Sequence, residues 1–225
     1  MDLQLADRVI LVVGGTGLIG RAVADLARAE GATVVTAARG DGADVRLDGA
    51  DPASVDAAVA RVLAEHGRID GLVVAAAPPA QTLDPARSSD PEQVAQAFEA
   101  KAMTFLRVAN AVVPTMREAG SGRIVGVSGQ NARLSGSITA ATRNAGLTIA
   151  AQALADDLAG TGVAVNVVDP GPVVDAPAQE VAVGKPGESS PEQVARAVLF
   201  LLSPANAISS QSIAVGHRVR GVLTL

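Results

Sequence analysis

Short runs of apolar, mostly β-branched residues recur along the chain, and stretches with the composition of helices separate them. Each run is continuously apolar instead of alternating with polar residues, which is typical of strands that helices cover on both faces. The runs predict seven strands, at Val9–Val13, Thr33–Ala37, Val45–Leu47, Leu72–Ala76, Ile124–Ser128, Val163–Val168 and Ile213–Val215. Strands that alternate with helices predict an α/β fold with a doubly wound parallel sheet.

Two expected helices carry the same start signal. The segments Asp90-Pro91-Glu92-Gln93 and Ser190-Pro191-Glu192-Gln193 each supply a capping side chain, a proline for the first turn and a glutamine at the capping-box position. Gly67 and Gly120 are placed to end two other helices. The loops 77–91 and 171–191 follow expected strands, at the edge where open α/β sheets bind ligands.

A glycine-rich loop joins the first expected strand to the first expected helix. It reads Gly14-Gly15-Thr16-Gly17-Leu18-Ile19-Gly20. Glycines at 14, 17 and 20 allow a tight turn, a close approach to a pyrophosphate and close packing of helix on strand, while the helix N-terminus supplies N–H donors. Because the strand and the helix are both present, the loop predicts a dinucleotide site.

The composition excludes several kinds of chemistry. The 225 residues include no Cys, no Tyr and no Trp, and His66 and His217 are the only histidines, so we expect neither a thiol nucleophile nor a metal site. The formal net charge of −5 disfavours nucleic acid or an anionic membrane as partner. With no signal segment and 48% apolar residues, the sequence predicts one cytoplasmic domain over 1–225. Only two of the 18 basic residues are lysines and alanine is abundant, a composition that suggests a GC-rich bacterial genome.

The order of several motifs resembles that of the short-chain dehydrogenase/reductase family. The stretch GGTGLIG looks like its phosphate loop, and LDGADPASVDAAVARVLAEHGRIDGLVV is similar to the part that begins at the adenine-contacting aspartate, here Asp48. GRIVGVS looks like its fifth strand, and VAVNVVDPGPV like its sixth strand with the Pro170-Gly171 turn beside the nicotinamide. The resemblance implies an oxidoreductase with these cofactor-binding residues: Gly14, Thr16, Gly17, Leu18, Ile19, Gly20, Arg39, Asp48, Ala75, Asn144, Pro170, Gly171 and Val173.

The residue after the second strand bears on which dinucleotide binds. No acidic side chain is present there to accept a hydrogen bond from a ribose 2′-hydroxyl, whereas Arg39 can pair with a 2′-phosphate. The sequence therefore favours NADP(H) over NAD(H). The alternative is that Arg39 is a surface residue at a strand end with no role in cofactor binding. The connection from Arg39 to Asp48 is too short for the family's crossover helix.

The catalytic residues that the resemblance implies are missing. The family's tyrosine falls at Ala140, its lysine at Asn144, its serine at Gly129 and its asparagine at Lys101. A shift by one residue pairs Thr139 with Arg143, which still supplies no usable acid. The candidates that remain for the chemistry are Ser128, Gln130, Asn131, Lys101 and Asn144.

Lys101 has two interpretations. Burial lowers the pKa of a lysine, so Lys101 is the one candidate acid of adjustable strength. Alternatively, it extends from its apolar helix into solvent. Asn144 can still hydrogen-bond a ribose, and Ser128, Gln130 and Asn131 can polarise a carbonyl or a carboxylate.

Three functions stay open at this point. They are a divergent oxidoreductase for a small metabolite, a non-redox enzyme that performs isomerisation, dehydration or cyclisation, and a catalytically silent subunit or sensor. The alanine-rich helices expected at 91–118 and 139–159 resemble the family's oligomer-forming pair, and this resemblance implies a homodimer or homotetramer, or a hetero-oligomer with an active relative.

Overall fold

The computed structural model describes residues 2–78, 82–133 and 136–221. Within these ranges one parallel sheet has the strand order β3-β2-β1-β4-β5-β6-β7. The strands are β1 (Val9–Val13), β2 (Thr33–Ala38), β3 (Val45–Arg46), β4 (Gly71–Val74), β5 (Gly122–Val127), β6 (Val163–Pro170) and β7 (Ser212–Val215). The order reverses between β1 and β4, which confirms the predicted doubly wound sheet.

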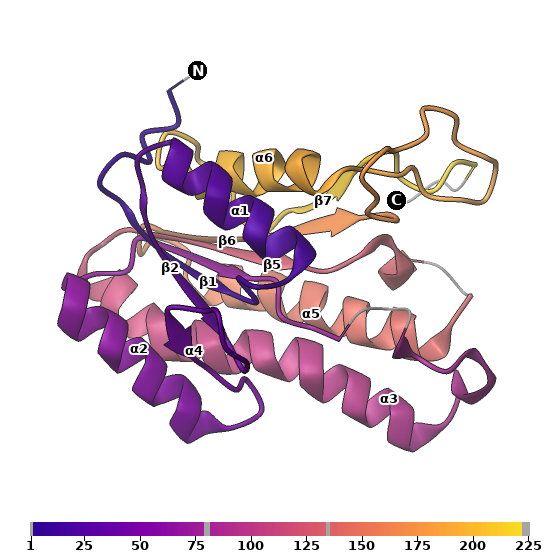
Figure 1. Ribbon diagram of the computed structural model, residues 1–225, viewed down its shortest axis with the longest axis horizontal. Helices are drawn as coiled ribbons and strands as arrows, with labels where there is room; N and C mark the ends of the chain where they lie inside the picture. The colour runs from indigo at the N-terminus through magenta and orange to yellow at the C-terminus, as the bar shows by residue number, and fades with distance from the viewer. Residues whose placement is uncertain (1, 79–81, 134–135, 222–225) are drawn as a thin grey trace.

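Helices cover both faces of this sheet (Figure 1). One layer contains α1 (Leu18–Ala29) and α6 (Pro191–Leu202), and the other contains α2 (Pro52–His66), α4 (Thr104–Glu118) and α5 (Ile138–Asp157). Helix α3 (Pro91–Phe98) runs through a π-helical turn, Glu99–Met103, into α4. In the part of the chain that the structure describes, no helix has the length and hydropathy needed to cross a bilayer.

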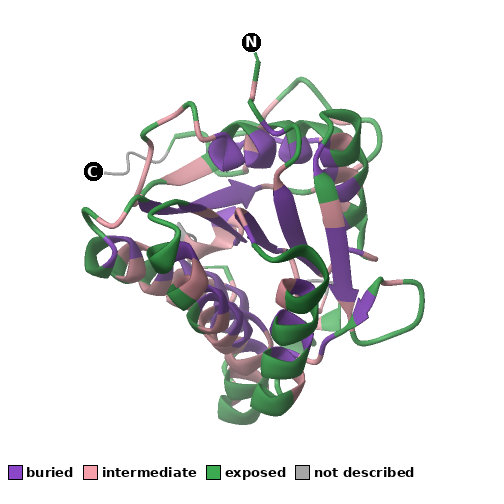
Figure 2. Ribbon diagram, turned by 90° about the vertical axis from the view of Figure 1, so that its left-hand side faces the viewer, coloured by how far each residue is buried: buried purple, intermediate pink, exposed green. Residues whose placement is uncertain are grey.

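Two apolar cores lie on the two faces of the sheet. Neighbouring strand residues point to opposite faces, so Leu11 joins the core under α2, α4 and α5, whereas Ile10 and Val12 join the core under α1 and α6. The central strands β1, β4, β5 and β6 are buried almost throughout, as the purple strands of Figure 2 show, which explains why their sequences are continuously apolar.

The connection from β2 to β3 is as short as the sequence predicts. Residues 39–44 link the strands, and Asp44 binds back to β2 from the end of this link. Asp44 Oδ2 accepts hydrogen bonds from Thr36 N at 2.8 Å and from Thr36 Oγ1 at 2.6 Å. These bonds hold the pKa of the Asp44 carboxyl below its usual value. A helix is therefore unnecessary for closing this edge of the sheet.

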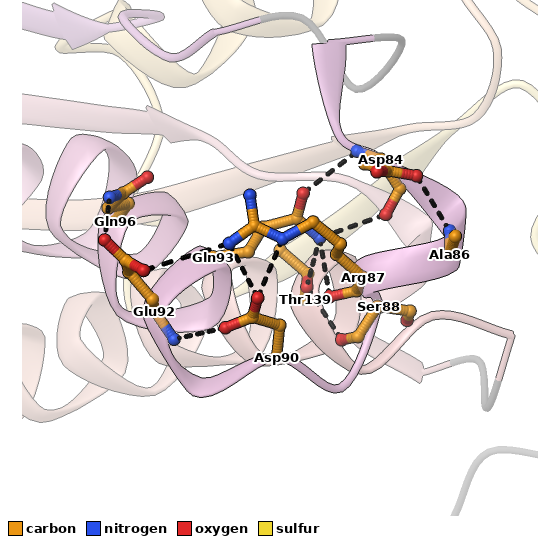
Figure 3. A network of polar contacts seen from close by, with 9 residues as sticks. All are labelled: Asp84, Ala86, Arg87, Ser88, Asp90, Glu92, Gln93, Gln96 and Thr139. Carbon is orange, nitrogen blue, oxygen red and sulfur yellow. Dashed lines mark hydrogen bonds and ion pairs between the residues drawn. The ribbon is translucent and has the colours of Figure 1, made fainter.

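The two helix-start signals have different outcomes. Ser190 and Gln193 form the expected capping box at α6. At α3, Asp90 caps Glu92 N, but the prediction of a box with Gln93 is wrong. Figure 3 shows the Gln93 amide bonded instead to Asp84 and Arg87 and directed toward Thr139. Tertiary partners compete with the local backbone for this side chain.

Strand β4 ends earlier than its sequence predicts. Its last residue is Val74. Ala75 N still donates a hydrogen bond to Val13 O, and after this bond the chain leaves the sheet. The alanines at 75–77 continue the apolar run, so no turn signal precedes Pro78 in the sequence. Their departure from the sheet opens space at the C-terminal edge of the strands.

Candidate functional site

Two cavities adjoin along the C-terminal edge of the sheet. The first has a volume of about 320 Å³, and the second has a volume of about 460 Å³. They share Gly17, Ala75, Ala77 and Pro78 in their walls. The pair therefore forms one elongated site at the point where the strand order reverses, the usual ligand position in this architecture.

The first cavity lies between the glycine loop and the ends of β2 and β3. Its wall contains Gly14, Thr16, Gly17, Arg39, Asp48 and Ala75 from the predicted cofactor-binding set. Arg39 is exposed at the rim, and Asp48 Oδ1 accepts a hydrogen bond from Ala50 N at 3.0 Å. Sequence reasoning missed Gly49, Ala100 and Thr104 in the same wall, because no motif marks them.

The glycine loop has the backbone geometry that its sequence predicts. Gly14 has φ +85°, and a Cβ on it would lie 2.7 Å from Ala76 N. A Cβ on Gly20 would lie 2.1 Å from Gly14 O, so the start of α1 can pack on the loop only without a side chain.

The N-terminus of α1 is left open toward the cavities. Its N-cap is Gly17, which has no side chain to bond the first N–H groups, and its first turn has no acidic residue. These N–H donors fit the pyrophosphate of a dinucleotide.

If the loop holds a nicotinamide dinucleotide, Gly20→Ala is expected to weaken binding of NADPH and of NADH by more than about tenfold, because the new methyl group pushes Gly14 out of the loop geometry. Isothermal titration calorimetry measures the change. Gly136→Ala is the matched control, since a Cβ there meets nothing within 4 Å. Equal NADPH affinity in Gly20→Ala and wild type would show that the loop does not form the dinucleotide site.

The second cavity brings together the rest of the predicted site. Its wall contains Leu18, Ile19, Gly20, Lys101, Ser128, Gln130, Asn131, Asn144, Pro170, Gly171 and Val173. These residues come from α1, the π-helical turn, the end of β5 with the 3₁₀ turn Gln130–Arg133, α5, and the end of β6 with the loop after it. Segments that are far apart in the sequence therefore meet at one place.

Lys101 lies in the wall of this cavity and is only 6% exposed. The alternative in which it extends into solvent is wrong: the π-helical turn directs its ammonium inward, where Nζ donates to Ser128 O at 2.9 Å. Burial lowers the pKa of Lys101 to about 7, with the Arg143 charge contributing to the decrease and Asp169 opposing it. A lysine with this pKa exchanges protons at neutral pH.

Ser128 and Asn144 hold each other at the end of β5. Ser128 Oγ donates to Asn144 O at 3.0 Å and accepts from Thr148 Oγ1 at 3.3 Å. The Asn144 side-chain oxygen Oδ1 is buried and has no hydrogen-bond partner within the described residues. A buried oxygen that lacks a donor is suited to accept a hydrogen bond from a hydroxyl group of a ligand.

Gln130 and Asp169 add polar groups around the cavity. Gln130 Nε2 donates to His217 O at 3.2 Å, which ties the wall to the segment after β7, and its Oε1 has no partner in the described chain. Asp169, buried beneath the wall, accepts a hydrogen bond from Ser212 Oγ. The sequence offered one signal for Asp169, a charged residue inside an apolar strand.

The two positions that the sequence resemblance assigns to a tyrosine and a lysine hold Ala140 and Asn144, and neither side chain is an acid. Ala140 is buried and is not among the described residues of either cavity wall. Under the shifted pairing, Thr139 is occupied in the network of Figure 3, where its Oγ1 donates to Ser88 O at 2.8 Å. Arg143, in contrast, lines the second cavity, although the sequence identified it only as a poor acid.

Comparison with known proteins relates the chain to dehydrogenases and reductases. Residues 17–217 match the family model described as enoyl-(acyl carrier protein) reductase. The chain is 29% identical over 184 residues to 3-oxoacyl-[acyl-carrier-protein] reductase FabG of Escherichia coli, with 75% of each chain covered. It is 31% identical over 239 aligned positions to D-threitol dehydrogenase of Mycolicibacterium smegmatis, covering 92% of this chain and 90% of the relative.

The fold is also similar to that of a solved dehydrogenase structure. The ligand-free aldohexose dehydrogenase of Thermoplasma acidophilum superposes with a TM-score of 0.81 at 20% identity, over 100% of both chains. At this identity the similarity concerns the fold alone.

Proposed function

This chain belongs to the short-chain dehydrogenase/reductase family, and from that premise we propose that it is an NADP(H)-dependent oxidoreductase for a small metabolite, with an active site rebuilt without tyrosine. The observation that carries the proposal is the pair of adjoining cavities, which together contain every predicted cofactor-binding residue. The first cavity would hold the adenosine half of the dinucleotide and the second the nicotinamide half.

The residues fit such a cofactor in chemical type. The open N-terminus of α1 and the side-chain-free loop suit the pyrophosphate, and the unpartnered Asn144 Oδ1 suits a ribose hydroxyl. The choice of NADP(H) is supported by the exposed Arg39 in the wall of the first cavity, because a guanidinium can pair with a 2′-phosphate.

Lys101 is the proposed proton donor. A bound cofactor would supply the hydride that the carbonyl carbon needs. Lys101 Nζ would give one proton to the carbonyl oxygen and become a neutral amine, so the product would be an alcohol. Its pKa of about 7 matches the working pH of a general acid, and its bond to Ser128 O fixes the ammonium. Ser128 itself is occupied by Asn144 and serves to position that wall.

The proposal replaces the family's mechanism because the chain contains no tyrosine. An asparagine at the lysine position carries no charge, so the positive charge of the site comes instead from Lys101 and Arg143. We also propose, in line with the exposed Ile149 on α5, that the helical segments 91–118 and 139–159 mediate self-association.

Titration with NADPH and NADH by calorimetry, followed by NADPH oxidation over a broad carbonyl panel, tests the function. Binding with turnover is the expected result. Binding without turnover of any carbonyl would favour a non-redox enzyme on the same fold, and no binding of either dinucleotide would favour a silent subunit or sensor.

Arg39→Ala is expected to weaken NADPH binding by about tenfold and to leave NADH binding unchanged, because only NADPH carries the 2′-phosphate. Calorimetry with both dinucleotides measures the two affinities. Arg117→Ala serves as control, since Arg117 is an exposed arginine near the end of α4, outside both cavity walls. An equal loss for NADH and NADPH would remove Arg39 from the choice of cofactor.

A further inference from the structure

The second cavity has an unbalanced charge. Its described wall contains two cationic side chains, Lys101 and Arg143, and no Asp or Glu. Neither cation forms an ion pair with any carboxylate among the described residues. Asp169 attracts the Lys101 ammonium from beneath the wall but is also bonded to Ser212. When Lys101 is protonated, the charges of Lys101, Arg143 and Asp169 add up to one positive charge.

The proposed reduction uses only the charge of Arg143 and gives its hydrogen-bond donors no partner. Arg143 is only 4% exposed, one N–H of its guanidinium donates to Pro78 O at 3.0 Å, and its Nε has no partner within the described chain. Burial lowers its pKa, which shows the cost of holding this charge away from water. Buried arginines are normally paired, because an unpaired buried charge is strongly unfavourable.

The geometry points to a carboxylate as the missing partner. We propose that the second cavity binds small oxo or hydroxy acids, with the ligand's carboxylate held by Arg143 and Lys101. The guanidinium offers planar paired donors that match a carboxylate, and the ammonium adds a second charge from another element, the π-helical turn. This inference rests on the proposed function, because it names the substrate class of the same site.

Anion binding should also shift a proton. Burial and Arg143 hold the Lys101 pKa near 7, whereas Asp169 is the charged group that opposes them. A carboxylate placed beside Lys101 favours its charged form, so binding raises the pKa of this lysine and takes up a proton near neutral pH.

The chain offers a direct probe of this effect, since Lys101 and Lys185 are its only lysines. Lysine labelled with ¹³C at Cε gives two signals in the full-length protein, and that of the exposed Lys185 is the internal reference. The ligands are pyruvate and acetoacetate, each compared with its methyl ester, with and without saturating NADP⁺.

We expect each acid to bind at least about tenfold more tightly than its ester and to raise the apparent pKa of the Lys101 signal. Arg143→Gln is expected to remove this preference and to change NADP⁺ affinity by less than about threefold. Arg117→Gln, which removes the same charge from an exposed site, should retain the preference.

Equal affinity for acid and ester, or no movement of the Lys101 signal at tens of millimolar acid, would overturn the proposal. The proposal also fails if Arg143→Gln weakens NADP⁺ strongly and leaves the acid preference intact, since Arg143 would then hold a cofactor phosphate. The acid and ester comparison uses the unaltered protein, so it decides the question even if Arg143→Gln does not fold. Because it is also made without NADP⁺, it is separable from failure of dinucleotide binding.

Discussion

Lys101→Met is expected to slow NADPH-dependent carbonyl reduction by a factor of about 10² to 10⁴, the usual contribution of a general acid, while NADPH affinity changes by less than about threefold. The thioether fills similar space in the cavity wall but has no proton to give. The bond from Nζ to Ser128 O is lost as well. Steady-state kinetics and calorimetry separate the two effects.

Lys185→Met is the matched control, because Lys185 is exposed and is not among the residues that line either cavity. The wild-type kcat/KM, which reports the free enzyme, should follow the protonated fraction of Lys101 and fall as pH rises above about 7. Unchanged turnover in Lys101→Met would rule out Lys101 as the acid. The proton would then come from a water molecule, or the reaction would be a non-redox one.

The stability of the wild-type protein is expected to rise between about pH 7 and pH 10, by on the order of 4 kcal/mol through Lys101 alone. Burial lowers the folded-state pKa of Lys101 to about 7, whereas the unfolded-state pKa is ordinary, about 10.4. In this range the unfolded chain binds more protons than the folded chain, so the free energy of unfolding increases with pH. Below about pH 7 the cost of the buried charge is present in full.

Urea unfolding at half-unit pH steps measures this slope, and Lys101→Met should flatten it. The composition favours the experiment, because the chain has no Tyr or Cys to titrate in the same window. Lys185→Met should keep the wild-type slope. A wild-type profile as flat as that of Lys101→Met would mean that Lys101 is solvated and is not the buried acid proposed.

Both predictions arise from a feature that the sequence left ambiguous. Lys101 in its apolar helix was compatible with solvent or with burial, because helical periodicity alone does not reveal a change of pitch. The π-helical turn Glu99–Met103 rotates the side chain toward β5. Similarly, Gln93 of the start signal at α3 bonds to distant residues instead of its own helix end. In both cases partners outside the helix decide, and two of them, Ser128 for Lys101 and Thr139 for Gln93, are far away in the sequence.

The strands, the glycine loop and the cap of α6 could be predicted because each depends on a pattern within one short segment. The strands were found because burial on both faces requires continuous apolar runs, and the glycine loop was found because φ +85° at Gly14 and the close contacts at Gly14 and Gly20 exclude side chains. The Ser190 cap was found because its partner, Gln193, lies three residues away.

The sequence by itself determined the α/β fold, the glycine loop before α1 and the absence of tyrosine, since each depends on residue type or on spacing within one segment. The tertiary structure alone decided that Lys101 and Arg143 share a cavity wall in which no described residue is a carboxylate. Burial, pairing and the resulting pKa depend on which segments meet across the sheet, and a linear sequence does not specify those distances.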